Sequence, residues 1–161
     1  MGLKIKGRRN IKKYKSIIKD GIISCCNHVH YWDFLGISYG IRPYKPKFLA
    51  WAKNIRGGLG KPIRPFKRGT ASYAVKYNKP ILPMAYTYRR PGFIKRRIFK
   101  QIALFTLNIG SPIYKNDNLP YSEQEYDLTK RAHEEVCKLA NINPSDNIYG
   151  PVFNNSKKIN Y

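Results

Sequence analysis

Acidic residues are scarce in this chain of 161 residues, and their scarcity limits the chemistry open to it. Asp and Glu number 9 against 31 Lys and Arg, which gives a formal net charge of +22 at pH 7. No acidic side chain occurs between Asp33 and Asp117, a stretch with 18 Lys or Arg, and no Glu precedes Glu123. A carboxylate site in the first two-thirds of the chain can therefore use only Asp20 or Asp33. The excess of positive charge indicates a polyanionic partner: nucleic acid, an anionic membrane surface or a phosphorylated ligand.

Cysteines and long apolar runs are also few. Of the three cysteines, Cys25 and Cys26 are adjacent, and neighbours in an extended segment point to opposite faces, which excludes a disulfide framework and favours a reducing compartment. No apolar run approaches the roughly 18 residues that span a bilayer, and residues 1–10 lack the apolar core of a signal peptide. We therefore expect a single domain over 1–161 that is cytoplasmic and peripheral on the inner face of the membrane.

Strand and helix patterns alternate along the chain. Residues 1–20 are a basic lead-in with apolar residues at roughly helical spacing, and residues 141–161 are an irregular tail. Gly and Pro punctuate residues 54–65, which predicts a loop. The predicted strands are 22–26, 47–51, 81–86 and 102–107, and the predicted helices begin at Asp33, span 69–78, and span 122–139 with Ser122 as the N-cap. Alternating strands and helices indicate an α/β layered fold.

The chemistry-bearing residues lie in the run 27–33 (NHVHYWD). His28 follows a predicted strand, and Asp33 lies five residues later in the first turn of a predicted helix. In a tight strand-to-helix corner the carboxylate can reach the imidazole and fix its tautomer, which leaves the other ring nitrogen free to accept a proton from a hydroxyl. Two alternatives stay open. Asp33 could be a helix N-cap beside a loop histidine, or His28 and His30 could be metal ligands, although no third ligand of suitable type lies nearby.

The run 26–36 (CNHVHYWDFLG) resembles the N-H-x4-D block of the glycerolipid acyltransferase superfamily, in particular that of bacterial 1-acyl-sn-glycerol-3-phosphate acyltransferases. Further along the chain, residues 65–69 (PFKRG) resemble the family's P-F-K-x-G helix start. Residues 79–84 (KPILPM) are similar to its final Pro-bounded strand, and residues 108–113 (NIGSPI) to the strand end that follows. These blocks come in the expected order and cover most of residues 5–140.

The resemblance implies a layered sheet with flanking helices and an enzyme of 1-acylglycerol-3-phosphate O-acyltransferase type. Such an enzyme transfers a fatty acyl group from acyl-CoA or acyl carrier protein to the hydroxyl of a lysophosphatidate. It implies that His28 is the general base and that Asp33 orients it, with no metal and no cofactor beyond the thioester co-substrate.

The chain departs from the family pattern in its middle. Only about fifteen residues separate Phe48 from Pro65, where the family carries two further blocks that hold the substrate phosphate. The resemblance thus implies a fold that lacks a middle strand and helix. Arg64, Lys67 and Arg68 are the remaining candidates for phosphate contact, because a helix start with free amide donors and adjacent cations binds anions. The same three residues also fit a solvated basic turn.

The rival interpretation is a non-enzymatic, basic nucleic-acid-binding protein. The net charge favours it, but the chain lacks a recognisable motif of that class. The basic stretch 89–97 fits an anionic inner leaflet. Four aromatic residues lie in or near this stretch and could instead stack on single-stranded nucleic acid: Tyr86, Tyr88, Phe93 and Phe99. Tyr86 and Tyr88 also fit one face of a strand.

Overall fold

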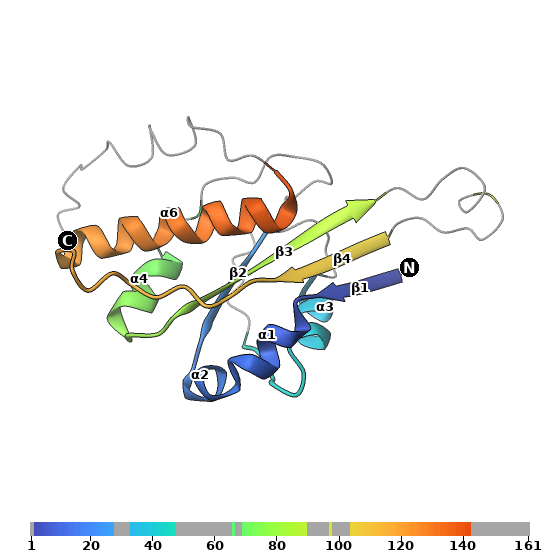
Figure 1. Cartoon of the computed structure of the whole chain (residues 1–161), viewed down its shortest axis with the longest axis horizontal. Helices are drawn as coiled ribbons and strands as arrows, with labels where there is room; N and C mark the ends of the chain where they lie inside the picture. The colour runs from blue at the N-terminus through green and yellow to red at the C-terminus, as the bar shows by residue number, and fades with distance from the viewer. Residues whose placement is uncertain are drawn as a thin grey trace.

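Four strands form one mixed sheet with helices on both faces in the computed structural model of this chain (Figure 1). The structure describes residues 2–27, 33–47, 66, 69–89, 97 and 104–142. The predicted α/β class is confirmed. The elements are, in chain order, β1 (Gly2–Lys6), α1 (Arg8–Lys13), α2 (Lys15–Asp20), β2 (Ile23–Cys26), α3 (Asp33–Gly40), α4 (Gly69–Lys76), β3 (Ile81–Arg89), β4 (Leu104–Ile109) and α6 (Tyr121–Ala140).

The strand order is β1-β4-β3-β2. β1 is parallel to β4, β4 is antiparallel to β3, and β3 is parallel to β2. Met84 lies at the centre of this arrangement, paired with Cys26 on one side and Ile109 on the other, and it is fully buried. The described sheet therefore combines a parallel β2–β3 pair, whose carboxyl ends point to one edge, with an antiparallel return through β4.

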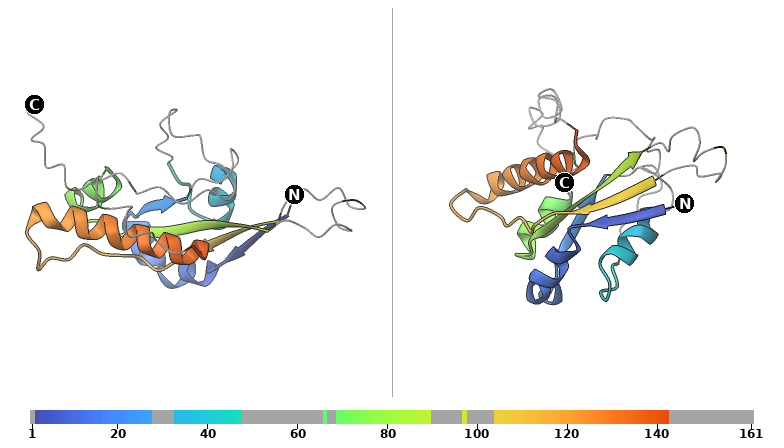
Figure 2. Two further views of the ribbon diagram at one scale, coloured as in Figure 1. Left: turned by 90° about the horizontal axis from the view of Figure 1, so that it is seen from above. Right: turned by 45° about the vertical axis from the view of Figure 1, so that its right-hand side comes forward.

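Two hydrophobic clusters lie on opposite faces of the sheet, and successive residues of β3 contribute alternately to one and the other. Ile81 and Ala85 pack with residues of α4 and α6. Leu82, Met84 and Tyr86 pack on the other face with residues of α1 and α3. The right-hand view of Figure 2 shows α6 on one side of the strands and α2 and α3 on the other. The described part of the chain thus has three layers, helices–sheet–helices.

The two adjacent cysteines follow the same alternation. Cys25 belongs to the cluster under α4 and α6, and Cys26 packs against the cluster under α1 and α3. Both thiols are free. The expectation that their side chains point to opposite faces is confirmed.

The prediction of a basic lead-in over residues 1–20 is wrong for residues 2–6. Residues 2–6 form β1, which pairs with β4 in the register Gly2↔Leu104, and helices α1 and α2 follow it. Asn10 of α1 donates its side-chain amide to the carbonyl oxygens of Ile109 and Gly110, each at 3.0 Å, and so ties α1 to the end of β4. The apolar residues of the lead-in therefore contribute to the sheet and its cover.

Most other predicted elements are confirmed where the structure describes them. Strand 22–26 corresponds to β2, helix 69–78 to α4, strand 81–86 to β3 and strand 102–107 to β4, with ends that differ by up to three residues. Helix α3 begins at Asp33, as predicted. Apart from Lys47, the predicted strand 47–51 lies outside the described residues, as do the loop 54–65 and residues 143–161 of the tail.

Helix α6 begins one residue earlier than predicted, and Ser122 is not its N-cap. Pro120 occupies the N-cap position, and no side chain caps the helix. The backbone N–H groups of Glu123 and Gln124 donate to the Pro120 carbonyl at 2.9 and 3.0 Å. The extended backbone of Pro120 therefore already accepts the first helical hydrogen bonds, which places Ser122 inside the first turn.

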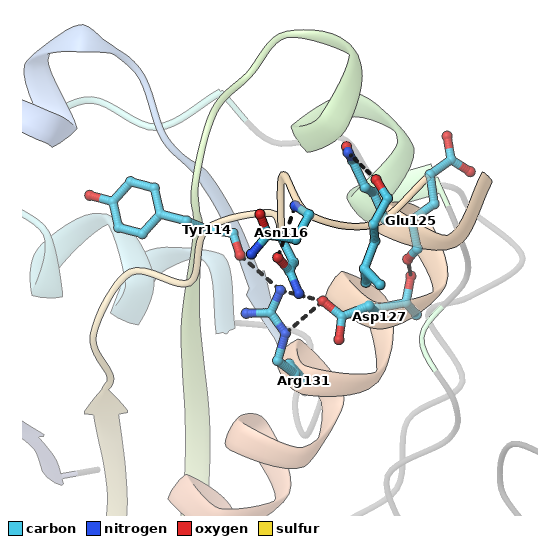
Figure 3. Close-up of polar contacts among 9 residues, drawn as sticks. Tyr114, Asn116, Glu125, Asp127 and Arg131 are labelled. Carbon is cyan, nitrogen blue, oxygen red and sulfur yellow. Dashed lines mark hydrogen bonds and ion pairs between the residues drawn. The ribbon is translucent and has the colours of Figure 1, made fainter. Parts of the chain in front are cut away.

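An arginine in the middle of α6 connects the helix to the segment that follows β4 (Figure 3). Arg131 Nε donates to Asp127 Oδ2 at 2.8 Å, and an Arg131 Nη2–H donates to the Tyr114 carbonyl at 2.9 Å. The apolar face of the same helix packs on the sheet, where Leu128 and Val136 are fully buried. None of the helices in the described ranges combines the length and apolar character needed to cross a membrane.

Candidate active site at the corner between β2 and α3

Asn27 extends the pairing of β2 by one residue through its side chain. The last strand residue, Cys26, is paired with Met84. Asn27 Nδ2 donates to the Tyr86 carbonyl at 3.0 Å, and Asn27 Oδ1 accepts from the Tyr86 N–H at 2.7 Å. This pair of hydrogen bonds fixes the position from which the chain continues to His28. His28 and His30 lie outside the described residues.

Asp33 lies at the other end of the six-residue connection 27–32, in the first turn of α3. The residue is only 7% exposed. Its backbone carbonyl accepts a hydrogen bond from the Tyr86 hydroxyl at 2.7 Å. Tyr86 therefore contacts both ends of the connection that contains His28: its backbone holds Asn27, and its phenol holds Asp33.

Two described ionisable groups beside Asp33, the Tyr86 phenol and the Cys26 thiol, have raised pKa values. Burial is the main cause of the raised pKa of the Tyr86 phenol, and electrostatic interactions with Cys26 and Asp33 add to it. Burial likewise raises the pKa of the Cys26 thiol, with smaller contributions from Cys25 and Asp33. Because a thiol must ionise to act as a nucleophile, the raised pKa disfavours that role for Cys26. The Tyr86 hydroxyl acts as a hydrogen-bond donor.

Gly36 permits the contact between Tyr86 and Asp33. A Cβ atom on Gly36 would lie 2.1 Å from the Tyr86 hydroxyl oxygen, closer than atoms can approach. One turn later, a Cβ on Gly40 would lie 2.7 Å from Leu107 Cδ2. The two glycines thus form the face of α3 that lies directly on the sheet.

Sequence reasoning assigned no site role to Tyr86 or Gly36. The sequence offered two interpretations of Tyr86, a strand residue or an aromatic residue that stacks on nucleic acid. The first is confirmed, because Tyr86 lies in β3. The second is wrong, because Tyr86 is 4% exposed and its hydroxyl is bonded inside the protein. The side chain of Tyr88, as well as Phe93 and Phe99, lie outside the part of the chain whose side chains are described. The spacing of Gly36 and Gly40, four residues apart on one helix, is the signal that could have indicated a close helix–sheet contact.

The three candidate phosphate residues, Arg64, Lys67 and Arg68, lie outside the described residues. Phe66, between them, packs against the cluster under α4 and α6. Its ring meets the ring of the buried His133 edge-on, with centroids 5.3 Å apart. The predicted helix start at Gly69 is confirmed. The chain turns at 77–80 between α4 and β3, so the helix and the strand run in opposite directions. Because β2 is parallel to β3, the first residues of α4 lie toward the carboxyl end of β2 (Figure 1).

His133 is the one histidine that the structure describes, and it belongs to the core of α6. The Cys137 sulfur lies 3.6 Å from its Nε2 atom, and burial raises the pKa of the Cys137 thiol. No group of three potential metal-ligating side chains occurs among the described residues. Compared with family models, with curated proteins and with solved structures, the chain matches none of them.

Replacing Gly36 with Ala is expected to destabilise the protein through Tyr86. Ala normally stabilises a helix interior by about 1 kcal/mol relative to Gly, but here forcing an atom against the Tyr86 hydroxyl costs about 1–3 kcal/mol. Tyr86→Phe removes a buried hydrogen bond, which costs about 1–3 kcal/mol. The double variant is expected to be more stable than the sum of the two losses predicts, by about 1 kcal/mol. Urea unfolding of the four proteins measures this coupling.

The matched control is Gly69→Ala, because a Cβ atom at Gly69 would have no neighbour within 4 Å among the residues that the structure describes. This variant is expected to unfold at the same urea concentration as the unsubstituted chain or at a higher one. Strictly additive losses for Gly36→Ala and Tyr86→Phe would contradict the contact between the helix and the phenol.

Proposed function

We propose that this chain is an acyltransferase of the glycerolipid type, with His28 as the general base and Asp33 as the residue that orients it. The observation that carries the proposal is the corner at the end of β2. A six-residue connection leads from Asn27 to the buried Asp33, and Tyr86 holds both of these residues. The described contacts fix the two residues that flank His28, and a base with its orienting carboxylate needs such fixed flanking positions because catalytic groups act only when their geometry is maintained.

The proposed reaction transfers an acyl group from a thioester of CoA or acyl carrier protein to a lysophosphatidate. The His28 imidazole accepts the proton of the acceptor hydroxyl while the oxygen forms a bond to the thioester carbonyl carbon. The tetrahedral intermediate then breaks its carbon–sulfur bond, and the departing thiolate takes the proton from the imidazolium. The carboxylate of Asp33 fixes the imidazole tautomer and stabilises the imidazolium. Its burial strengthens both effects, because charges interact more strongly where water is excluded.

The phosphate of the acceptor is proposed to bind near the start of α4. Phe66 packs against the core and against His133, and the helix begins at Gly69. Arg64, Lys67 and Arg68 supply the positive charge in this proposal. Helix starts of this kind favour anions through their unpaired N–H groups and through the helix dipole.

The test is an assay of thioester cleavage with a defined acceptor. The purified chain is incubated with palmitoyl-CoA and lysophosphatidate, and free CoA and phosphatidate are measured together. We expect equal amounts of both products and no CoA release when lysophosphatidate is omitted. Lysophosphatidylcholine, whose phosphate carries a choline cap, is the matched acceptor and is expected to react more slowly. CoA release that is independent of the acceptor would contradict the proposal.

One observation favours the second candidate function, nucleic-acid binding. Tyr73 and Tyr77 stack in parallel on the outer face of α4, with ring centroids 6.1 Å apart, and about half of each residue is exposed. Exposed aromatic rings beside cations are typical of single-strand binding, and Lys76 lies next to Tyr77. Tight binding of single-stranded RNA that is lost in Tyr73→Ser, without acceptor-dependent CoA release, would favour this candidate over the acyltransferase.

A further inference from the structure

The outer face of α3 carries exposed apolar and aromatic side chains. Leu35 is 52% exposed and Tyr39 is 47% exposed. These two positions lie four residues apart on α3 and so share one side of the helix, and Arg42 lies in the turn that follows the helix. The inner side of α3, with Gly36 and Gly40, lies on the sheet. An aliphatic side chain exposed to this degree beside a tyrosine is a feature that a partner surface would cover.

Two arginines from different elements converge on Tyr39. The guanidinium carbon of Arg8, at the start of α1, lies over the Tyr39 ring at 5.8 Å from its centroid. The guanidinium carbon of Arg42 lies over the same ring at 5.2 Å. These cation–π contacts join α1 and α3 into one surface, which we call the α1–α3 surface and define by Arg8, Leu35, Tyr39 and Arg42.

The charge around the α1–α3 surface is almost entirely positive. Residues 2–20 and 33–47 contain eleven Lys or Arg, all exposed, and two acidic residues. Asp20 accepts a hydrogen bond from Lys79 at 2.7 Å, and Asp33 is buried. Five of the nine acidic residues of the chain lie instead on α6, beyond the sheet, where three of them pair with basic residues of the same helix. The described face around α1 and α3 therefore has unbalanced positive charge.

We propose that the α1–α3 surface docks on an anionic lipid bilayer. Cations near such a bilayer gain free energy from its negative potential, and an exposed Leu beside a Tyr suits the boundary between headgroups and acyl chains. A nucleic acid fits this surface less well. Its phosphates give no partner for Leu35, and two guanidinium groups already lie over the ring on which a base would stack.

This docking extends the proposed acyl transfer but is measured without turnover. Asp33 begins the helix whose outer face would contact the bilayer. The candidate active site would then lie at the lipid–water boundary, where a lysophosphatidate presents its headgroup. If the chain docks but does not transfer acyl groups, the proposed function fails and the docking proposal stands. If it transfers acyl groups but does not dock, the docking proposal fails and the proposed function stands.

The first experiment compares two double variants that lose the same charge. Arg8→Gln with Arg42→Gln removes two cations from the α1–α3 surface, whereas Lys76→Gln with Lys138→Gln removes two exposed cations from helices on the other face of the sheet. Each protein is mixed with vesicles of 70% phosphatidylcholine and 30% phosphatidylglycerol at 0.15 M salt, and bound protein is separated by flotation. We expect about tenfold weaker binding for the first variant and less than a twofold change for the second. Equal effects of the two variants would overturn the proposal.

The second experiment reports which residues enter the bilayer. A polarity-sensitive fluorophore is attached to Leu35→Cys and, as the matched control, to Tyr77→Cys, and the unsubstituted protein gives the background from its own three cysteines. Vesicles are expected to shift the emission of the Leu35 label to the blue and to leave the Tyr77 label unchanged. The opposite pattern would overturn the proposal. So would single-stranded RNA that binds more tightly than vesicles and depends on Arg8 and Arg42.

Discussion

His28→Ala is expected to reduce acyl transfer by at least 10²-fold, whereas His30→Ala leaves the rate within a factor of about two. A positioned general base contributes about 10²–10⁴-fold, and in the proposed mechanism His28 alone accepts the proton of the acceptor hydroxyl. The two histidines are separated by one residue in the same connection between β2 and α3. His30→Ala is therefore a control for any effect of the substitution on the connection itself.

The measurement is phosphatidate formation from palmitoyl-CoA and lysophosphatidate, with unfolding in urea recorded for each variant. Asp33→Asn completes the series, because an amide cannot hold the imidazole in the productive tautomer or stabilise its charged form. If His28→Ala keeps more than about a tenth of the rate, His28 is not the base. If His30→Ala loses as much activity as His28→Ala, a shared site or a metal site must replace the proposed mechanism.

Inserting a family-like middle segment between residues 49 and 64 is expected to raise the rate of acyl transfer by about 10²-fold. The base accounts for only part of an enzymatic acceleration, and positioning of the acceptor hydroxyl accounts for much of the rest, so that a misplacement of about 1 Å can cost about 10²-fold. The proposed relationship to glycerolipid acyltransferases implies that positioning would depend on two blocks that hold the phosphate, and residues 49–64 are too few to contain them. In the proposed mechanism, Arg64, Lys67 and Arg68 would supply positive charge for the phosphate but not the complete set of contacts.

The comparison needs two further chains. One carries a Gly/Ser-rich segment of the same length at the same point, which tests whether added length alone changes the rate. The other combines the family-like insertion with His28→Ala, which is expected to return the rate to the background. Comparable turnover by the original chain and the chain with the insertion would show that Arg64, Lys67 and Arg68 suffice to hold the substrate.

The elements predicted correctly from the sequence are those with a strong local pattern. β2, β3 and β4 are apolar runs bounded by Gly, Pro or Asn, and α6 has the length and apolar periodicity of an amphipathic helix. β1 was missed for a physical reason. Leu3 and Ile5 do alternate with Lys4 and Lys6, as in a strand, but five residues among many cations give a weak signal. Their pairing partner, β4, lies about 100 residues away, and no local pattern can indicate it.

The elements that flank the candidate site were predicted, whereas the roles of His28 and Asp33 stay predictions. The spacing of these two residues drew attention to the corner, and the structure confirms a strand that ends at Cys26 and a helix with Asp33 in its first turn. The burial of Asp33 is a finding of the structure. The roles of Tyr86 and Gly36 were not predicted, because they depend on a contact between a helix and a strand about 50 residues apart in the chain. A tyrosine in a strand gives no sequence signal that its hydroxyl reaches a particular carbonyl.

The pairing of β1 with β4 has a consequence for biosynthesis. At a translation rate of about 5–20 residues per second, a partner about 100 residues away emerges about 5–20 s later. During that interval β1 has no neighbouring strand of its own sheet, and Leu3 and Ile5 are open to other chains. The lysines at positions 4 and 6 are both exposed in the finished sheet. Their positive charges would repel the same segment of a neighbouring nascent chain on the polysome, and so disfavour pairing of unpaired β1 segments between chains.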